Sequence, residues 1–396
     1  MAYPFIYITA ARRTPMGGFL GSLATLSAPA LGAEAVDAVL TDSGLEPAAV
    51  EEVVMGNVLP AGTGQGPARQ AARHGGLQDG TGATTVNKLC GSGMKATMFG
   101  HDLIRAGSGD VVLSGGMESM SNAPYLLTDA RRGYRMGPGR APQDHMFIDG
   151  LQDAETTRLM GEFAQETADR LGYSRKAMDA FAIRSLERAN TAINNSWLNA
   201  ETVAVSQIDR KGNETNVRDD EQPGQANIDR IPSMRPAFAK DGTITAANAS
   251  SISDGASALM LMSGAAVDRH GSKPLARILG HATFSRHPSE FTLAPVGAIQ
   301  RLLEYTGWST EDVDLYEINE AFAVVAMIAM DELALAPEKV NIHGGACAQG
   351  HPIGSTGSRL IVSLIHALRR TGGRRGIASL CIGGGEATAM AIELCD

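Results

Sequence analysis

The sequence predicts an α/β protein made of two similar halves with one inserted segment. Short apolar stretches bounded by glycine alternate with helical patterns, which is typical of an α/β domain. A pattern of glycine turn, helix, strand, glycine cluster and glutamate occurs twice in the chain. Residues 129–241 hold about 30% Asp, Glu, Lys and Arg, against about 15% elsewhere, which indicates a more solvated insertion.

Short apolar runs predict the strands, taken in order along the chain. They lie at residues 5–9, 52–56, 111–114, 275–279, 315–318 and 377–381. Apolar residues at helical spacing predict the helices between them, at residues 31–42, 93–105, 174–194, 298–306, 321–334 and 357–370.

The internal repeat joins these elements into two similar units. Residues 91–118 form the first copy and residues 354–386 the second, and each copy ends on a glutamate after a glycine cluster. Residues 53–57 match residues 315–319 in the same way. A functional site at the junction of the two units would follow from this arrangement.

The composition predicts a globular protein with a large core. The chain has 396 residues, of which 43% are hydrophobic and 19% are charged, so it is long enough for more than one domain. Its net charge of -9 argues against a general nucleic-acid binder, because such proteins present a basic surface to phosphates. The longest apolar stretch, residues 321–330, is shorter than the ~20 residues that cross a bilayer, so we expect no membrane span.

The location of the protein is expected to be cytoplasmic. Residues 1–11 are apolar with arginines after the run, which is the reverse of a secretory signal. The four cysteines are too few for a disulfide framework in a chain of this length, which favours a reducing compartment.

Cys90 is a candidate nucleophile. It lies on a turn before Gly91 that leads into the predicted helix at residues 93–105. The partial positive charge at a helix N-terminus favours a thiolate over a thiol, and the glycines let a substrate approach the backbone. The alternative is a small buried thiol, which is the commoner situation for a lone cysteine.

His351 is the candidate base. It stands beside Pro352 in a glycine-dense loop, residues 343–357, and a histidine is the usual partner of a catalytic cysteine. His343, at the start of the same loop, is expected to be structural.

Cys381 and Asn319 both follow predicted strands. The glycines after Cys381 suit a second thiol that moves protons, although a core cysteine is an equal alternative. The Asn319 amide could bind a carbonyl or orient a water, or it could cap a helix. Two cysteines and one histidine on glycine-rich turns indicate an acyl thioester on one thiol and proton transfer at carbon by the other. Because the three lack tight ligand spacing, we expect no metal here.

Seven motifs, in the same order, closely resemble the thiolase family over nearly the whole chain. They lie at residues 10–17, 87–96, 115–121, 248–256, 319–323, 344–357 and 381–385. The resemblance implies a five-layered αβαβα fold of two similar halves with an inserted loop domain. Residues 1–121 and 252–272 would form the N-terminal half and residues 273–396 the C-terminal half. Residues 122–251 would form the loop domain, which binds CoA and makes oligomer contacts.

The resemblance also implies a reaction and a role for each candidate residue. The family makes or splits 3-ketoacyl-CoA thioesters by ping-pong acyl transfer, so acetyl-CoA, CoA and 3-ketoacyl-CoA are the implied partners and no further cofactor is implied. Cys90 would take the acyl group, His351 would activate it, and Cys381 would shuttle the proton at the substrate α-carbon. Asn319 would hold a water that forms one oxyanion hole with His351, and the backbone N–H groups of Cys90 and Gly383 would form the other.

Substrate choice depends on the residues around the acyl group. The resemblance places Ser250 along the pantetheine arm, and we expect Leu159, Met160, Ala321 and Phe322 to line the pocket. Leu159 occupies a position where many acetoacetyl-specific members carry histidine, and residues 291–297 lack the glycine-proline form common there. We favour acetyl-CoA C-acetyltransferase, and a broad-chain degradative 3-ketoacyl-CoA thiolase is the alternative.

Basic residues are the candidates for binding phosphates and other copies of the chain. The loop domain offers Arg218, Arg230 and Arg235 to the CoA phosphates. A second group lies in the segment that joins two dimers in tetrameric relatives, so we expect a homotetramer or a homodimer. It comprises Arg131, Arg132, Arg135 and Arg140, for which a solvated loop is the alternative.

Two other classes of protein fit the sequence less well. Condensing enzymes of fatty-acid and polyketide synthesis share the fold but generally pair their cysteine with two histidines, or with a histidine and an asparagine. The presence of Cys381 therefore favours a thiolase. An inactive relative that only binds acyl-CoA would be expected to have lost Cys90, His351 or Cys381, and all three are present.

Overall fold

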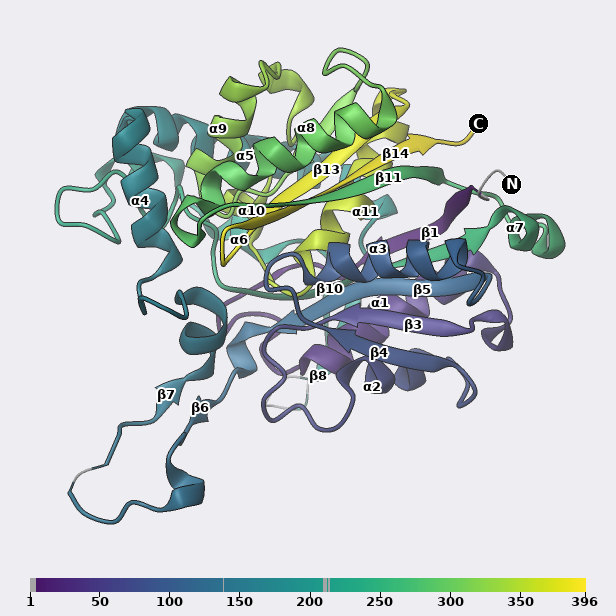
Figure 1. Cartoon of the computed structure of the whole chain (residues 1–396), viewed down its shortest axis with the longest axis horizontal. Coiled ribbons are helices and arrows are strands. Elements are labelled where there is room, and N and C mark those ends of the chain that lie inside the picture. The colour runs from purple at the N-terminus through teal and green to yellow at the C-terminus, as the bar shows by residue number, and fades with distance from the viewer. Residues whose placement is uncertain (1–4, 138, 209–211, 213) are drawn as a thin grey trace.

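Two helices, α3 (Ser92–Arg105) and α11 (Thr356–Thr371), lie side by side in the middle of the protein between two layers of strands (Figure 1). The computed structural model describes residues 5–137, 139–208, 212 and 214–396. One strand layer and an outer layer of helices cover each side of this helix pair. The five layers and the two halves predicted from the sequence are confirmed.

The strands of the two layers meet edge to edge. Within the described residues they form one ten-stranded sheet in the order β12-β13-β14-β11-β1-β10-β5-β3-β4, with β2 beside β10. Strands β1 and β11 join the halves through antiparallel pairs such as Tyr7 with Arg277. The bounds are β1 (Ile6–Arg13), β2 (Gly17–Gly18), β3 (Glu52–Gly56), β4 (Gly82–Val86), β5 (Val111–Ser119), β10 (Ser253–Ser263), β11 (Ala276–Ser285), β12 (Leu315–Ile318), β13 (Arg375–Ile382) and β14 (Glu386–Leu394).

The predicted repeat is visible in the topology. In the N-terminal half β3 and β5 are parallel, and β10 and β1 continue the sheet as antiparallel strands. In the C-terminal half β12 and β13 are parallel, and β14 and β11 continue in the same way. The carboxyl ends of corresponding strands therefore meet near the middle of the molecule.

Helices of the two outer layers cover the sheet faces that turn away from α3 and α11. In the N-terminal half α1 (Ala28–Ser43) packs on β1, β5 and β10, with α2 (Pro67–His74) beside it. In the C-terminal half α8 (Ala294–Thr306) packs on β11, β13 and β14, with α9 (Ala323–Glu332) beside it. Further helices are α7 (Gly264–His270) and α10 (Ala346–Gln349).

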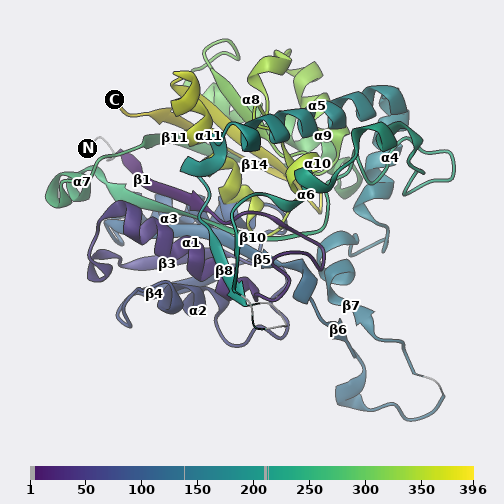
Figure 2. The same ribbon diagram turned by 180° about the vertical axis from the view of Figure 1, so that it is seen from behind.

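The charge-dense part of the chain lies between β5 and β10. It begins with an arm formed by β6 (Tyr125–Leu126) and β7 (Gln143–Asp144), which extends away from the rest of the protein (Figures 1 and 2). The remaining elements there are α4 (Met160–Leu171), α5 (Arg175–Asn194), β8 (Val205–Ile208), β9 (Glu214–Val217) and α6 (Glu221–Gln225). Short helical turns occur at Pro47–Ala49, Met120–Asn122, Ala130–Arg132, Phe147–Leu151, Trp197–Ala200, Ile228–Ser233, Pro288–Leu293 and Pro337–Lys339.

Helices α3 and α11 touch through their first turns. A side chain at Gly93 would lie 2.6 Å from Ser358 Oγ and 2.8 Å from the Ser358 backbone nitrogen, and one at Gly357 would overlap the backbone nitrogen of Met94. Glycine is therefore required at both positions for the two backbones to come this close. Around this contact the apolar side chains of both strand layers form a continuous core with the two helices.

No helix in the described part of the chain is both long enough and apolar enough to span a bilayer.

The glycine contact predicts a specific loss of stability. Gly357→Ala should lower the free energy of unfolding by about 1–3 kcal/mol, because the added methyl group has to displace the backbone of Met94. Gly80→Ala is the matched control, since Gly80 is exposed and nothing lies within 4 Å of its added methyl group. Urea unfolding followed by circular dichroism compares the two variants. Equal urea midpoints for Gly357→Ala and the wild type would show that the helix contact has room to relax.

Candidate active site

A pocket of about 230 Å³ lies where the two halves and the segment between β5 and β10 come together. Most of the residues predicted for the site line it, namely Cys90, Leu159, Met160, Ser250, Ala321, Phe322, His351, Cys381 and Gly383. The remaining walls are mainly apolar. Sequence analysis did not single out their members Met120, Phe147, Leu151, Phe238, Phe291 and Ile353, because apolar residues at these positions resemble ordinary core.

Cys90 projects from a constrained turn between β4 and α3. The preceding residue, Leu89, has a φ of 48°, a left-handed conformation that a leucine seldom adopts. Three hydrogen bonds hold the turn. The Leu89 N–H donates to Asn87 Oδ1 at 2.9 Å, the Lys88 N–H donates to Ser92 Oγ at 2.8 Å, and that hydroxyl donates to the Leu89 carbonyl at 2.6 Å. The strain at Leu89 is thus maintained by its neighbours and fixes the direction of the thiol.

The surroundings of Cys90 favour the thiol over the thiolate. Burial raises its pKa to about 11, although hydrogen bonds from the backbone N–H groups of Gly383 and Cys90 itself oppose the rise. The helix N-terminus was expected to favour the thiolate, but desolvation in the mainly apolar pocket outweighs it. Cys90 therefore needs a base when it reacts.

Cys381 faces the same pocket from the end of β13. It is buried, and its pKa lies well above the usual value because of burial first and the proximity of Cys90 second. Gly383, two residues on, directs its N–H toward the Cys90 sulfur. The two cysteines and this N–H donor are thereby brought together from opposite halves of the fold.

His351 presents one defined nitrogen to the pocket. Its Nδ1 lies 2.6 Å from Thr356 Oγ1, and this hydroxyl donates to the Pro352 carbonyl at 3.0 Å. Because the hydroxyl hydrogen is used for that bond, Nδ1 carries the ring hydrogen and Nε2 keeps a free lone pair. Burial, followed by the charge of Arg359, lowers the pKa of His351 to about 3, so the imidazole is neutral.

Asn319 follows β12 and directs its amide at the histidine. Its Nδ2 lies 3.5 Å from His351 Nε2, whereas its Oδ1 has no hydrogen-bond partner among the described residues. Helix α9 begins only at Ala323, with Phe322 as its cap, so the helix-cap alternative for Asn319 is not what the structure contains. A polar group buried in this way is available to a substrate or a water.

Two glutamates at equivalent points of the repeat hold the catalytic loops. Glu118, at the end of β5, accepts hydrogen bonds from Asn57 Nδ2 at 2.7 Å and from the Gly354 backbone N–H at 2.9 Å. Glu386, at the start of β14, forms an ion pair with Lys88. Each glutamate thus holds the loop that carries a candidate catalytic residue of the other half, His351 or Cys90. Sequence analysis found both glutamates in the repeat but assigned them no role.

Burial shifts the ionisation of Glu118 as well. Its pKa rises to about 7, although hydrogen bonds from the backbone N–H groups of Val58, Leu59 and Gly354 favour the charged form. A carboxylate with so many donors is a structural tether rather than a proton carrier for the pocket, which it does not line.

Other predicted residues lie away from the pocket. Arg218, Arg230 and Arg235 are exposed, and none of them lines it. Arg131, Arg132, Arg135 and Arg140 are exposed along the arm. His343 is buried, its Nε2 accepts a hydrogen bond from Arg370 Nε at 2.7 Å, and its ring lies on Trp197, which fits the structural role expected for it.

Comparison with known proteins gives full-length matches. The family model described as the N-terminal domain of thiolase matches residues 6–265, and that of the C-terminal domain matches residues 272–394. An acetyl-CoA acetyltransferase of Chromobacterium violaceum is 45% identical over 98% of this chain and 99% of its own length. One from Schizosaccharomyces pombe is also 45% identical, over 98% of both chains. Among solved structures, the Acat5 thiolase from Ascaris suum in complex with coenzyme A has a TM-score of 0.93 and 39% identity, with 99% of this chain and all of that one covered.

The neutral state of Cys90 predicts how its reactivity depends on pH. Alkylation of Cys90 by iodoacetamide should accelerate roughly tenfold per pH unit through the neutral and alkaline range, because only the thiolate reacts and its pKa is about 11. The rate is measured on the Cys90 peptide by mass spectrometry, which separates it from Cys347, Cys381 and Cys395. A rate that is already level near neutral pH would mean that Cys90 and His351 exist as an ion pair at rest.

Proposed function

Because the chain belongs to the thiolase family, we propose that it is an acetyl-CoA C-acetyltransferase, which condenses two acetyl-CoA molecules to acetoacetyl-CoA and CoA and also catalyses the reverse thiolysis. The observation that carries the proposal is the convergence of Cys90, His351 and Cys381 on one pocket, with the Gly383 N–H at the Cys90 sulfur. The activity named for the relatives supports the choice of substrate.

In the first half-reaction Cys90 takes the acyl group. His351 Nε2 accepts the thiol proton as the sulfur attacks the thioester carbonyl of acetyl-CoA. CoA leaves with the proton of the Cys381 thiol, so Cys381 becomes a thiolate and Nε2 of His351 stays protonated. The negative charge on the carbonyl oxygen is stabilised by the backbone N–H groups of Cys90 and Gly383, and a fixed donor of this kind contributes ~3 kcal/mol. The acetyl group then remains on Cys90 as a thioester.

In the second half-reaction the Cys381 thiolate takes a proton from the α-carbon of a second acetyl-CoA. The carbanion attacks the acetyl group on Cys90, and acetoacetyl-CoA forms as the Cys90 thiolate leaves and regains its proton from His351 Nε2. The protonated Nε2 of His351 and a water held by Asn319 stabilise the enolate oxygen of the second thioester. The apolar walls limit hydrolysis of the acyl-enzyme.

The residues around the catalytic group hold the CoA thioester. Ser250 lies along the pantetheine arm, where its backbone N–H donates to the Ala321 carbonyl at 2.9 Å and keeps it beside the pocket. The loop domain, residues 122–251, supplies Arg218 and Arg230 to the phosphates, since both are exposed. The substrates are CoA thioesters, and the proposed chemistry requires no further cofactor.

The arm is proposed to join copies of the chain in a homotetramer. It exposes Tyr125, Leu127, Tyr134 and Met136, with Met136 at 94% of its full area, together with the four arginines named above. Large apolar side chains exposed together mark an interaction surface. We place the enzyme in the cytoplasm, where its thiols stay reduced.

A broad-chain 3-ketoacyl-CoA thiolase is the second candidate, and Leu159 favours it. Leu159 lines the pocket with Met160, Phe238, Phe291 and Phe322, so the acyl end of the pocket is apolar where many acetoacetyl-specific members carry histidine. An apolar pocket gains ~0.8 kcal/mol per buried methylene when there is room.

The two cysteines should separate the two half-reactions. Cys381→Ser should still carry an acetyl group on Cys90 after incubation with acetyl-CoA, as detected by peptide mass mapping. It should lose the exchange of acetyl-CoA α-hydrogens with deuterated water, because a hydroxyl is a far weaker acid than a thiol. His351→Ala should instead slow acetylation itself. Exchange at the wild-type rate in Cys381→Ser, or an acetyl group found on Cys381, would reject these roles.

Chain-length preference separates the two candidate functions. The measurement is kcat/KM for thiolysis of four-, six- and eight-carbon 3-ketoacyl-CoA by the wild type and by Leu159→His. For an acetyl-CoA acetyltransferase we expect a fall of about a hundredfold from four to six carbons, which equals ~3 kcal/mol. A flat or rising series that Leu159→His converts to a falling one would establish the broad-chain enzyme instead.

A further inference from the structure

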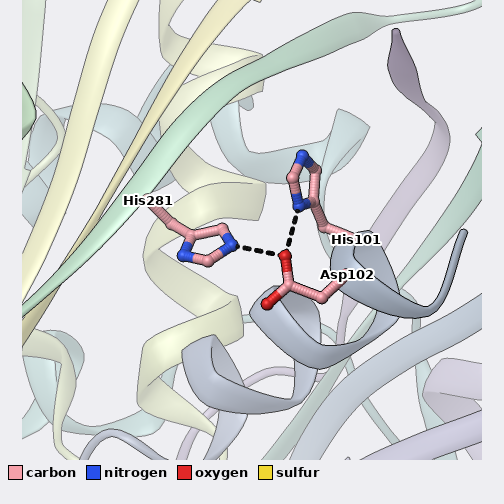
Figure 3. Close-up of side chains that lie close together, drawn as sticks. All are labelled: His101, Asp102 and His281. Carbon is pink, nitrogen blue, oxygen red and sulfur yellow. Dashed lines mark hydrogen bonds and ion pairs between the residues drawn. The ribbon is translucent and has the colours of Figure 1, made fainter. Parts of the chain in front are cut away.

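Two histidines and one aspartate from the two halves of the fold converge outside the catalytic pocket (Figure 3). His101 and Asp102 are consecutive residues on α3, and His281 lies on β11. Asp102 Oδ1 lies 2.9 Å from His101 Nδ1 and 3.0 Å from His281 Nε2. One potential ligand atom from each residue lies within 4.8 Å of the other two.

Each of the two rings turns one nitrogen toward the carboxylate, and the rings lie edge to face. Their centroids are 5.0 Å apart and their planes meet at 87°, so one nitrogen of each ring can point at a common position beside Oδ1. The His101 and His281 side chains are 5% and 18% exposed, whereas that of Asp102 is 51% exposed. Protein thus encloses the cluster on the side of the rings, and solvent reaches it on the side of the carboxylate.

The two hydrogen bonds of the cluster can give way to metal ligation. In the metal-free arrangement each ring donates an N–H to Asp102. When a cation binds, the nitrogen that donates to Asp102 gives up its hydrogen and becomes a ligand.

We propose that His101, Asp102 and His281 form a binding site for one divalent first-row transition ion of the zinc class. Two imidazoles and one carboxylate with an open fourth position are a ligand set that Zn²⁺ accepts, and water from the exposed side completes the coordination. Mg²⁺ and Ca²⁺ are disfavoured, since both prefer sets made wholly of oxygen. The cations of Lys95 and Arg105 act on this cluster and oppose the ion, so its affinity is lower than that of a closed four-ligand site.

The site would act as a clamp between the halves and not as part of acyl transfer. Cys90 lies two residues before α3, and His101 lies nine residues, about 14 Å, beyond the first residue of this helix. None of the three ligands lines the catalytic pocket. An ion here would fasten the C-terminal part of the N-terminal half's central helix to strand β11 of the other half. The expectation of no metal concerned Cys90, His351 and Cys381, none of which belongs to this cluster.

Equilibrium dialysis of the chelator-treated full chain against Zn²⁺ tests the proposal. Asp102→Asn and His281→Ala should each bind one Zn²⁺ ion per chain fewer than the wild type, or bind that ion roughly tenfold more weakly. Asp102→Asn keeps an oxygen that can accept both ring N–H groups, so its fold and its unfolding temperature without metal should be unchanged. His270→Ala is the matched control, because His270 is an exposed histidine outside the cluster and should bind as the wild type does.

Two further measurements separate this site from the catalytic thiols. Zn²⁺ should raise the unfolding temperature of the wild type and of His270→Ala but not that of Asp102→Asn. Co²⁺ should give ligand-field bands in the visible region without a thiolate charge-transfer band. Equal zinc binding by the wild type and Asp102→Asn overturns the proposal, as does a thiolate band that disappears in Cys90→Ser, because either result places the ion elsewhere or nowhere.

Discussion

The site depends on the backbone contact between the first turns of α3 and α11. Gly93 and Gly357 allow the two helices to approach until only backbone and the short side chain of Ser358 separate them. Cys90 lies two residues before one helix and His351 five residues before the other, so this contact brings the proposed nucleophile and its proposed base into one pocket. Glu118 and Glu386 then fix the loops by holding, respectively, Gly354 and Lys88 of the opposite half.

Desolvation controls the electrostatics of the pocket. It raises the pKa of Cys90 to about 11 and lowers that of His351 to about 3, so both groups are neutral before substrate binds. The helix N-terminus and the N–H of Gly383 do not create a resting thiolate, and these fixed dipoles remain available to a charge that develops during reaction. A neutral pair in an apolar pocket is also less exposed to oxidation, because the thiolate is the reactive form.

Sequence patterns predicted the fold and a candidate catalytic group, but not the contacts that place this group. All six predicted strands and all six predicted helices are present, with ends that differ by up to six residues. Strands β10 and β14 were not predicted. They are rich in alanine, serine and methionine, which have little β propensity, and pairing with β5 and β13 determines their conformation. Cys90, His351 and Cys381 could be named as candidates because each stands beside glycines in the sequence. The cluster of His101, Asp102 and His281 could not be predicted from the sequence, since His281 lies 179 positions after Asp102.

Equivalent positions in the two similar halves have different contacts. Asn57 and Asn319 both follow equivalent strands, yet the Asn57 amide is engaged by Glu118, whereas the Asn319 amide faces His351. In the same way, the turn before α3 carries the proposed nucleophile Cys90, whereas the loop before α11 carries the proposed base His351. When a unit occurs twice in one chain, a position can stabilise the fold in one copy and contribute to the reaction in the other. Selection should therefore preserve Asn57 for the stability of the fold and Asn319 for the rate of the proposed reaction.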